Sequence, residues 1–431
     1  MLTVAYLANQ FPSAVEPYVV EEIRELRGRG VHVIAGSVRR PATNEVSAAG
    51  CAPEIMLPPL RGIILLRAVW LCMQRWKRIS ALIGRIVFRG GERPLDRIKA
   101  LPHTLLGACY AVLLEGQGVE HIHVHHGYFG SWIAMVAARL LGVEFSMTLH
   151  GSDLLLHGTY LDVKLENCSF CLTVSEYNRG FILKRYPALD SAKVIVARLG
   201  VEVSEPAILP VPKVNTKALP FTILTVGRLH WVKDHAFLIR ACAQLQQCGV
   251  WFECWIAGDG PEWRNLQSLI RKYRLEDRVT LLGHLGRRDV DSWYDRADLV
   301  VLTSRSEGIP LVLMEGMARG KIVLAPDITG IPELVTSAKT GFLYESGSLN
   351  QFVDRLLLLR SLTQARDETR QNPHICVAIK QLDQVRHEAQ AHIFHNFNRR
   401  KNLELFSELF LQRIASQAES VPHENFVLQQ I

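Results

Sequence analysis

The stretch LVVLTSRSEGIPLVLMEGMARGKIVLAP, residues 299–326, contains two short apolar segments joined by a single predicted helix. Segments 299–304 and 321–326 have the length and the β-branched content of buried strands. Between them, Pro310 suits the first turn of a helix and Gly320 the position after its last residue, which predicts a helix of about ten residues. Two apolar strands flanking a helix are typical of a parallel sheet covered by helices.

The same alternation extends through the rest of the chain. Further strands are expected at 221–227, 251–260 and 278–283 in the second half, and at 2–8, 31–37, 121–126, 144–150, 170–175 and 193–200 in the first. This order predicts an α/β protein of two Rossmann-like, doubly wound domains that face each other across a cleft. Ligands of such sheets bind beyond the carboxyl ends of the strands, so the residues that follow the apolar segments are the candidates for function.

A proline-rich connection separates the two halves. Residues 205–220 contain four prolines and neither a helical nor an alternating pattern. We therefore expect an N-terminal domain over 1–208 and a C-terminal domain over 209–398. An amphipathic helix is expected at 399–416, after the second sheet is complete; its docking place is open, with a return to the first domain as one option.

Composition narrows the class of protein. The chain has 431 residues, of which 48% are hydrophobic and 21% charged, as in ordinary globular proteins. Its nine cysteines and the absence of a signal-peptide pattern predict a cytoplasmic setting. The net charge of +7 comes with no zinc-finger spacing, RNP-type motif or basic helix with heptads, so nucleic acid is not expected as a partner.

The positive charge is concentrated in one segment. Residues 61–89 carry seven Lys or Arg and no acidic residue, mixed with tryptophan, leucine and isoleucine. This pattern is typical of a helix that lies on an anionic membrane, and the charges interrupt it too often for a membrane span. The alternative is a pair of ordinary domain helices with a solvated basic face.

Glu315 stands in the middle of the predicted helix, among apolar residues that cover most of its circumference. A buried carboxylate without a partner is costly. One explanation is an i,i+4 ion pair with Arg319 at a solvent-facing edge. The other is that Glu315 accepts hydrogen bonds from paired ligand hydroxyls while the free N–H groups of Gly308, Ile309 and Leu311, around Pro310, face an anion.

A ligand with a diol and a phosphate would be a nucleotide sugar, and its diphosphate requires positive charge. Arg228 and Lys233 follow the first strand of the second domain and can supply that charge. The segment AGDGPE, residues 257–262, has two glycines but lacks the third glycine of a dinucleotide-binding fingerprint. A nicotinamide cofactor is therefore disfavoured.

Together these segments resemble the retaining family 4 glycosyltransferases of GT-B fold, of the exopolysaccharide and colanic-acid type. The most specific mark is a Glu-x7-Glu motif, here Glu307 and Glu315. The resemblance implies that Glu315 binds the ribose hydroxyls and that Arg228 and Lys233 bind the diphosphate. It implies that Glu307, with the backbone of Gly308, Ile309, Pro310 and Leu311, binds the transferred sugar.

The first domain resembles the same family. TLHGSD, residues 148–153, is similar to its His-Gly-x-Asp segment, which implies that His150 points at the donor sugar and places Asp153 on the acceptor side. FPSAVEPYVVEEI, residues 11–23, is similar to its Phe-Pro-x-x-Ser-Glu-Thr-Phe segment and keeps Glu16 in register, again on the acceptor side. The Gly-Gly pair that many relatives carry after the first strand is absent, and Arg198 stands where relatives often have histidine.

No metal is expected at the site. His121, His123 and His125 alternate on one strand, where the outer two are about 13 Å apart and cannot share one ion. Asp289 and Asp291 are explained as acidic residues at a helix start. With cationic side chains and a helix N-terminus available for the leaving diphosphate, the resemblance implies metal-independent chemistry. The resemblance implies retention through front-face attack, with the protein mainly positioning the reactants.

We therefore expect an enzyme that transfers a sugar from a UDP- or GDP-sugar to a glycan or lipid-linked acceptor in surface polysaccharide assembly. A nucleotide-sugar 2-epimerase of similar architecture is the alternative enzyme, and analysis of the product separates the two. A nucleotide-sugar binder without activity is the third hypothesis. Such a binder would hold the donor and never release nucleotide.

Overall fold

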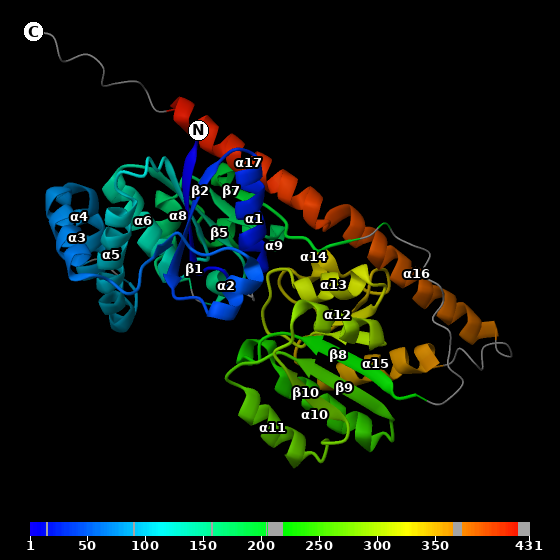
Figure 1. The fold of residues 1–431 in the computed structure, drawn as a ribbon. Helices are drawn as coiled ribbons and strands as arrows, with labels where there is room; N and C mark the ends of the chain where they lie inside the picture. The colour runs from blue at the N-terminus through cyan, green and yellow to red at the C-terminus, as the bar shows by residue number, and fades with distance from the viewer. Residues whose placement is uncertain are drawn as a thin grey trace, which may run out of the picture. The chain divides into compact units, whose positions relative to one another are not determined.

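The computed structural model describes residues 1–13, 16–88, 91–156, 158–203, 205, 219–364 and 373–420. The chain divides into two compact units, each built on its own sheet (Figure 1). Unit 1 contains Met1–Arg198 and Leu403–Ile431, and unit 2 contains Leu199–Asn402. The boundary that the sequence places between 208 and 209 lies outside the described residues.

The sheet of unit 1 has seven parallel strands in the order β3-β2-β1-β4-β5-β6-β7. Its strands are β1 (Thr3–Gln10), β2 (His32–Arg39), β3 (Ile55–Met56), β4 (His121–His125), β5 (Glu144–Leu149), β6 (Cys171–Thr173) and β7 (Val194–Val196). The chain moves outward from β1 to β3 and then returns to place β4 on the other side of β1. The topological switch point, where ligands bind in such sheets, therefore lies at the carboxyl ends of β1 and β4.

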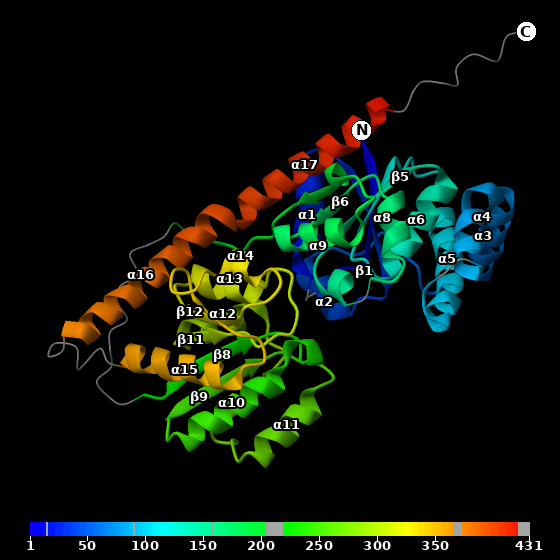
Figure 2. The same ribbon diagram turned by 180° about the vertical axis from the view of Figure 1, so that it is seen from behind.

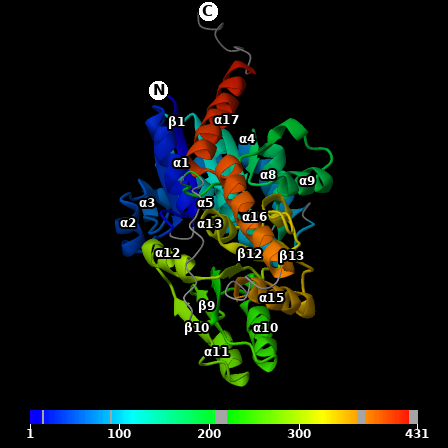
Figure 3. The ribbon, with the colours of Figure 1, turned by 90° about the vertical axis from the view of Figure 1, so that its right-hand side faces the viewer.

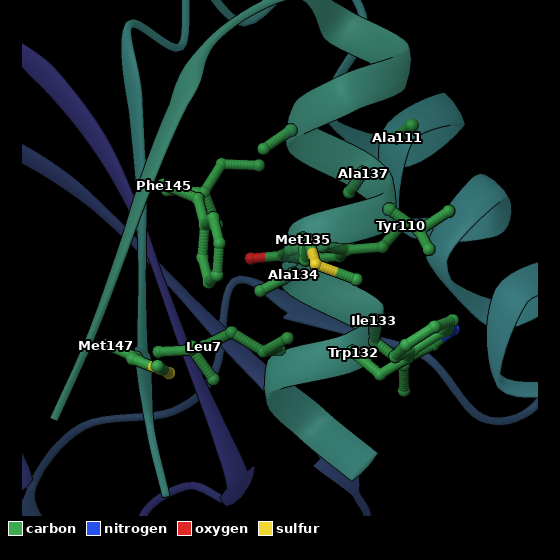
Figure 4. Packing of buried hydrophobic residues seen from close by; sticks show 14 of the residues in the cluster. Leu7, Tyr110, Ala111, Trp132, Ile133, Ala134, Met135, Ala137, Phe145 and Met147 are labelled. Atoms are coloured by element: carbon green, nitrogen blue, oxygen red, sulfur yellow. The ribbon is translucent and has the colours of Figure 1, made fainter. Parts of the chain in front are cut away.

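The helices of this unit form two layers. They are α1 (Pro17–Gly28), α2 (Thr43–Ala49), α3 (Gly62–Gln74), α4 (Trp76–Val87), α5 (Pro94–Leu114), α6 (Phe129–Leu141), α7 (Ser152–Leu155), α8 (Leu161–Asn167) and α9 (Glu176–Arg185). Helix α6 is apolar on all sides because it lies between the sheet and α5 (Figure 4). Gly107 of α5 permits the close crossing, since a Cβ there would lie 2.7 Å from Cβ of Val136.

The opposite face of the same sheet is covered by α1 and by the C-terminal helix α17 (Arg399–Ser420) (Figure 3). Phe410 of α17 is fully buried against the rings of Tyr6 and Phe170. Arg29 adds an ion pair with Glu408, at 3.7 Å. The chain thus leaves unit 1, forms unit 2 and returns to complete the core of unit 1.

The sheet of unit 2 has six parallel strands in the order β10-β9-β8-β11-β12-β13. They are β8 (Phe221–Val226), β9 (Phe252–Ala257), β10 (Val279–Gly283), β11 (Leu299–Val301), β12 (Ile322–Pro326) and β13 (Phe342–Tyr344). The order reverses between β8 and β11, which makes their carboxyl ends the switch point of this sheet. Both sheets match the predicted doubly wound class.

Two helical layers also cover this second sheet (Figure 2). One layer contains α10 (His235–Gln247), α11 (Trp263–Lys272) and α15 (Leu349–Gln364). The other contains α12 (Arg287–Arg296), α13 (Leu311–Ala318) and α14 (Ile331–Leu334), and α16 (Pro373–Asn396) packs against both α13 and α15. Within the described residues, no helix combines the length and the hydropathy that a membrane crossing requires.

Candidate functional site

The switch point of unit 2 brings a lysine and a glutamate together. Lys233 ends the short 3-10 turn Trp231–Lys233 that follows β8, and Glu307 follows β11. The Nζ atom of Lys233 lies 2.6 Å from Oε1 of Glu307, and both side chains are mostly buried. Sequence reasoning assigned these residues to a diphosphate and to a sugar, and the fold places them in direct contact.

Arg228 lies on a loop that is held by backbone contacts. A Cβ on Gly258 would lie 1.9 Å from the carbonyl oxygen of Gly227, so only glycine allows the loop after β9 to approach this closely. The N–H of Leu229 donates to the carbonyl of Asp259 at 2.9 Å. The guanidinium of Arg228 is exposed, and within the described residues it forms no ion pair.

Helix α13 begins one residue later than predicted, because Pro310 is its N-cap and Leu311 its first residue. The N–H groups of Gly308, Ile309 and Leu311 form no hydrogen bond within the described part of the chain. Such free donors at a helix N-terminus favour an anion. Gly330 lies against this loop so closely that a Cβ on it would be 2.0 Å from the carbonyl oxygen of Gly308.

Glu315 finds its partner on a neighbouring helix. The hydroxyl of Tyr294, on α12, donates to Oε2 of Glu315 at 2.9 Å. Burial and the adjacent carboxylate both raise the pKa of Tyr294, so its hydroxyl stays protonated and can donate. Arg319 forms an ion pair with Asp291 and bonds only the backbone carbonyl of Glu315. Arg319 therefore pairs with Asp291 in place of the i,i+4 ion pair with Glu315 that the sequence suggested. The side chain of Glu315 stays partly exposed.

A second group of polar residues gathers at the switch point of unit 1. His126, directly after β4, lies between two carboxylates: its Nε2 is 2.9 Å from Oε1 of Glu16, and its Nδ1 is 3.5 Å from Oδ2 of Asp153. His126 has a left-handed backbone with φ of 71°, which turns its side chain back toward these acids. The fold thus joins Glu16 and Asp153 through a histidine that sequence reasoning did not select.

The charges of this group stabilise one another. Burial alone would lower the pKa of His126, but the two carboxylates raise it to about 10. Burial alone would raise the pKa of Asp153, and contact with His126 holds it well below its usual value. Asp153 also accepts hydrogen bonds from the backbone N–H groups of Gly127, His150 and Gly151. A protonated histidine is therefore fixed beside an ionised aspartate.

His150 follows β5 and lies beside these groups. Its Nε2 is 3.0 Å from Nδ1 of His125, and the two rings are stacked with centroids 5.2 Å apart. Burial and the nearby His126 and His125 lower the pKa of His150, which keeps its ring neutral. The ring of Tyr18 lies 4.8 Å from it, and part of the His150 surface remains exposed.

Four residues of these sites escaped sequence reasoning: Tyr294, His126, Lys164 and Glu22, which lies on α1 with its Oε2 2.8 Å from Nε2 of His125. Lys164 is buried and donates to the carbonyls of Gly127, Tyr128 and Thr159, which fixes the loop after β4. Burial lowers the pKa of Lys164 to about 7. A useful signal exists for His126 alone, since it is the last residue of the predicted strand 121–126. The other three lie inside helices, where nothing in the local pattern marks them.

The remaining polar motifs have structural partners. His121 and His123 are buried and share the hydroxyl of Ser146, at 2.7 and 2.8 Å. Asp289 lies in the first turn of α12, as expected, whereas Asp291 pairs with Arg319. Among the described residues, no cluster of three His, Cys, Asp or Glu has the arrangement of a metal site.

The basic segment folds into α3 and α4, and most of its arginines are engaged. Arg75 and Arg78 donate to the carbonyl of Leu140 at the end of α6, Arg67 pairs with Glu115, and Arg85 pairs with Glu92. Arg61 and Lys77 are exposed, and Arg89 lies outside the described residues. Four of the six described basic residues of this segment nevertheless remain exposed, so a solvated basic face is present: Arg61, Arg67, Lys77 and Arg78.

The same region also exposes large apolar side chains. On α3, Ile63, Leu66, Trp70 and Met73 follow one helical stripe and are each exposed by 58% or more. Leu95 and Ile98 of α5 are exposed to a similar degree. We call this set of six residues the apolar stripe. Large exposed apolar patches are typical of interaction sites in proteins.

Comparison with known proteins shows which proteins this chain resembles. Residues 211–373 match the family described as Glycosyl transferases group 1. WcaL of Escherichia coli K12, described as a colanic acid biosynthesis glycosyltransferase, is 37% identical over 176 residues, which are 39% of this chain and 43% of WcaL. The amylovoran biosynthesis glycosyltransferase AmsK of Erwinia amylovora is 32% identical over 209 residues, 45% of this chain and 50% of AmsK. The chain therefore spans half the length or less of these relatives.

A solved structure extends the likeness to the whole chain. HepE of Anabaena, in complex with UDP and glucose, superposes with a TM-score of 0.65 at 16% identity, covering 96% of this chain and 100% of HepE. At this level of identity the likeness concerns the fold. It includes both units.

Proposed function

We propose that this chain, which has the GT-B fold and matches the group 1 glycosyl transferases over residues 211–373, is a sugar-transferring enzyme. The reaction moves a sugar, with retention, from a UDP- or GDP-sugar to a glycan or lipid-linked acceptor in surface polysaccharide assembly. One observation carries the proposal. The Lys233–Glu307 pair and the free N–H groups before α13 meet at the switch point of unit 2, where this fold class binds ligands.

The donor site follows from the chemistry of these groups. Glu315 accepts hydrogen bonds from the two ribose hydroxyls, with Tyr294 holding the carboxylate in place. Arg228 and Lys233 bind the diphosphate, and the N–H groups of Gly308 and Ile309 add donors for its oxygens. Glu307 keeps Lys233 next to the sugar position.

The same cations can stabilise the leaving diphosphate, so the proposed reaction uses no metal ion. The acceptor hydroxyl attacks from the face that the diphosphate leaves, and the departing phosphate oxygen takes its proton. His150 contacts the sugar that is transferred. Glu16 and Asp153 contribute on the acceptor side by holding His126.

The relatives support this setting. WcaL and AmsK are described as glycosyltransferases of colanic acid and amylovoran biosynthesis, and HepE was solved with UDP and glucose. We infer from them a nucleotide-sugar donor and a polysaccharide product. We propose that this protein acts in the cytoplasm, because sugar nucleotides are made there.

Calorimetric titration with UDP and with GDP tests the donor site. Glu315→Ala and Arg228→Ala should each weaken binding of the preferred nucleotide roughly 10- to 100-fold, because a hydrogen bond to a charged group contributes about 1.5–3 kcal/mol. Arg271→Ala, which removes an exposed arginine from α11, is the matched control and should bind normally. Unchanged affinity in both site variants would refute the assignment.

Product analysis tests the reaction class. Incubation with UDP-glucose, UDP-galactose or GDP-mannose and a glycan mixture should release UDP or GDP and form an α-linked glycoside. An epimerised nucleotide sugar without a glycoside would instead identify the alternative enzyme. Binding without any nucleotide release would identify a binder.

We further propose that unit 1 contacts the membrane through the apolar stripe. The apolar stripe is exposed beside arginines that already have protein partners, and we infer that the contact depends on insertion more than on charge. Arg61 and Lys77 add a smaller attraction to anionic lipids.

Co-sedimentation with vesicles of phosphatidylglycerol and phosphatidylethanolamine checks this contact. Binding should persist when salt rises to 0.5 M, since screening weakens charge attraction and leaves apolar insertion intact (ionic strength of that order reduces the Debye length to about 4 Å). Trp70→Ser should weaken it, whereas Trp251→Ser, which alters an exposed tryptophan of unit 2, should not. Binding that disappears at high salt would instead indicate the electrostatic contact expected from the sequence.

A further inference from the structure

A chain of three side chains links helix α1 to His150. The Oε2 atom of Glu22, on α1, lies 2.8 Å from Nε2 of His125, and Nδ1 of His125 lies 3.0 Å from Nε2 of His150. Glu22 and His125 are buried, with 4% and 0% of their surfaces exposed, and they are therefore shielded from competing water. The donor-site and acceptor-side assignments above leave both of them without a role.

The chemistry of Glu22 sets the direction of these hydrogen bonds. A carboxylate only accepts, so Nε2 of His125 must carry the proton that is shared with Glu22. The hydroxyl of Tyr6 donates to the same oxygen of Glu22 and lies 2.9 Å from Nε2 of His125. Because its single proton is used toward Glu22, the Tyr6 oxygen can only accept from Nε2–H, which agrees with this arrangement. The pKa of Tyr6 is raised by burial and by Glu22, which keeps that hydroxyl protonated.

The protonation of His125 in turn sets which atom donates in its hydrogen bond with His150. A neutral His125 protonated at Nε2 has a lone pair on Nδ1, which can only accept a hydrogen bond. Nε2 of His150 must therefore carry a proton and donate it to His125. In a neutral His150 this leaves the lone pair on Nδ1, and within the described residues that atom forms no hydrogen bond.

We propose that Glu22 and His125 are positioning residues that hold His150 as its Nε2–H tautomer, so that Nδ1 of His150 accepts a hydrogen bond from a sugar hydroxyl. The inference rests on the proposed function, which places His150 at the transferred sugar. The new element is the direction of the hydrogen bond between His150 and the sugar, in which the sugar donates and His150 accepts. His150 selects a hydroxyl, which can donate, over an anionic or carbonyl group, which cannot.

The surroundings of His150 fit this role. Asp153 binds its backbone N–H, and the rings of Tyr18 and His126 lie 4.8 and 4.6 Å from its imidazole. A protonated His126 disfavours a second positive charge on His150, and a neutral ring is what a hydrogen-bond acceptor requires. Together with His125, the rings of Tyr18 and His126 pack around the imidazole of His150 and hold its position.

Nitrogen NMR on the full chain tests the tautomers directly. Protein labelled with 15N-histidine is recorded at pH 7 by long-range proton–nitrogen correlation, and the signals of His125 and His150 are assigned from His125→Asn and His150→Asn. Both residues should be protonated at Nε2 and bare at Nδ1. A His150 protonated at Nδ1, or at both nitrogens, overturns the proposal.

Kinetics separate positioning from simple packing. His125→Leu should lower kcat at least about 10-fold, a loss in the range of a mispositioned catalytic group, while KM for the donor changes little. His125→Asn offers an amide oxygen to His150 and should recover most of kcat. The matched control is His121→Asn, which alters a buried histidine of the same strand that bonds Ser146 and not His150.

We call the hydrogen-bonded series Glu22–His125–His150 the relay. The outcomes of these experiments distinguish a failure of the relay from a failure of the function on which it rests. If His121→Asn loses as much kcat as His125→Leu, or if His125→Asn fails to recover it, the positioning role is refuted. If His150→Ala releases UDP or GDP at the wild-type rate, the role of His150 in the proposed function fails, and the hydroxyl contact fails with it. The tautomers measured by NMR would then still decide whether the relay exists.

Discussion

At the scale of single residues, both candidate sites rest on charged groups that meet from different elements. In unit 2, Lys233 and Glu307 arrive from the ends of two neighbouring strands. In unit 1, His126 is held between Glu16 and Asp153. Each arrangement keeps a charge in place before any ligand binds, which reduces the reorganisation needed when a charged substrate arrives.

His126 gives a prediction for stability against pH. Its pKa is raised to about 10 in the folded protein, above the usual value near 6.5 for an unfolded chain. The folded state therefore binds this proton more tightly, and the resulting stabilisation is complete below about pH 6.5 and is lost as pH rises toward 10. The lowered pKa of Asp153 acts in the opposite direction, and its stabilisation is lost in acid.

Urea unfolding at pH 6, 8 and 10 measures this effect. The difference in unfolding free energy between the wild type and His126→Asn should be largest at pH 6 and should shrink at pH 10. Asparagine is chosen because it tolerates the left-handed backbone at this position. His32→Asn, at an exposed histidine of β2, should show no such trend. A difference that stays constant with pH would contradict the charged state assigned to His126.

At the scale of elements, the loops after the strands are held in place by close backbone approach. The loop after β9 lies against the loop that carries Arg228, and the loop after β12 lies against the loop before α13. In both cases a glycine makes the approach possible, since a Cβ would overlap a carbonyl oxygen. The donor-site groups therefore depend on residues that would not touch the donor.

Gly330→Ala tests this dependence. Its Cβ would lie 2.0 Å from the carbonyl oxygen of Gly308, so the loop before α13 must shift. We expect weaker UDP or GDP binding by calorimetry and a loss of roughly 1–3 kcal/mol in stability, as for other overpacked sites. Gly286→Ala is the control, because its Cβ would meet nothing closer than 3.4 Å. Normal affinity in Gly330→Ala would show that the loop position does not matter for binding.

At the scale of the whole molecule, the two units are not consecutive pieces of the chain. Unit 1 is completed by α17, which arrives only after unit 2 has been formed. Phe406 and Phe410 of this helix are buried in the core of unit 1, together with residues of β1, β2 and α1. Unit 1 therefore requires the C-terminal helix for its full stability.

Phe410→Ala measures that contribution. Removing a fully buried phenylalanine should lower the unfolding free energy of unit 1 by about 3–5 kcal/mol. Leu405→Ala, at a site 56% exposed on the same helix, should cost far less. Calorimetric scans resolve the change as a lower Tm for the transition to which unit 1 contributes. An equal effect of both substitutions would contradict the docking of α17.

The sequence by itself determined the fold class and the elements that carry the candidate site. Apolar segments of strand length, Pro310 before a helix and Gly320 after it are local signals, and they sufficed to predict the doubly wound sheets that the structure shows. The solved structure of HepE supports the same GT-B fold. The Glu307–Glu315 spacing is likewise a property of one short segment. Such features are set by neighbours along the chain, so the residue order reveals them.

Only the tertiary structure decided which partners these residues have. Tyr294 reaches Glu315 from another helix, His126 joins Glu16 to Asp153, and Glu22 reaches His150 through His125. The arginines of α3 and α4 look like a basic surface in the sequence, yet most of them bond to groups outside the segment. Each of these contacts joins elements far apart in the chain, and packing of the sheets, rather than local pattern, brings them within hydrogen-bonding distance.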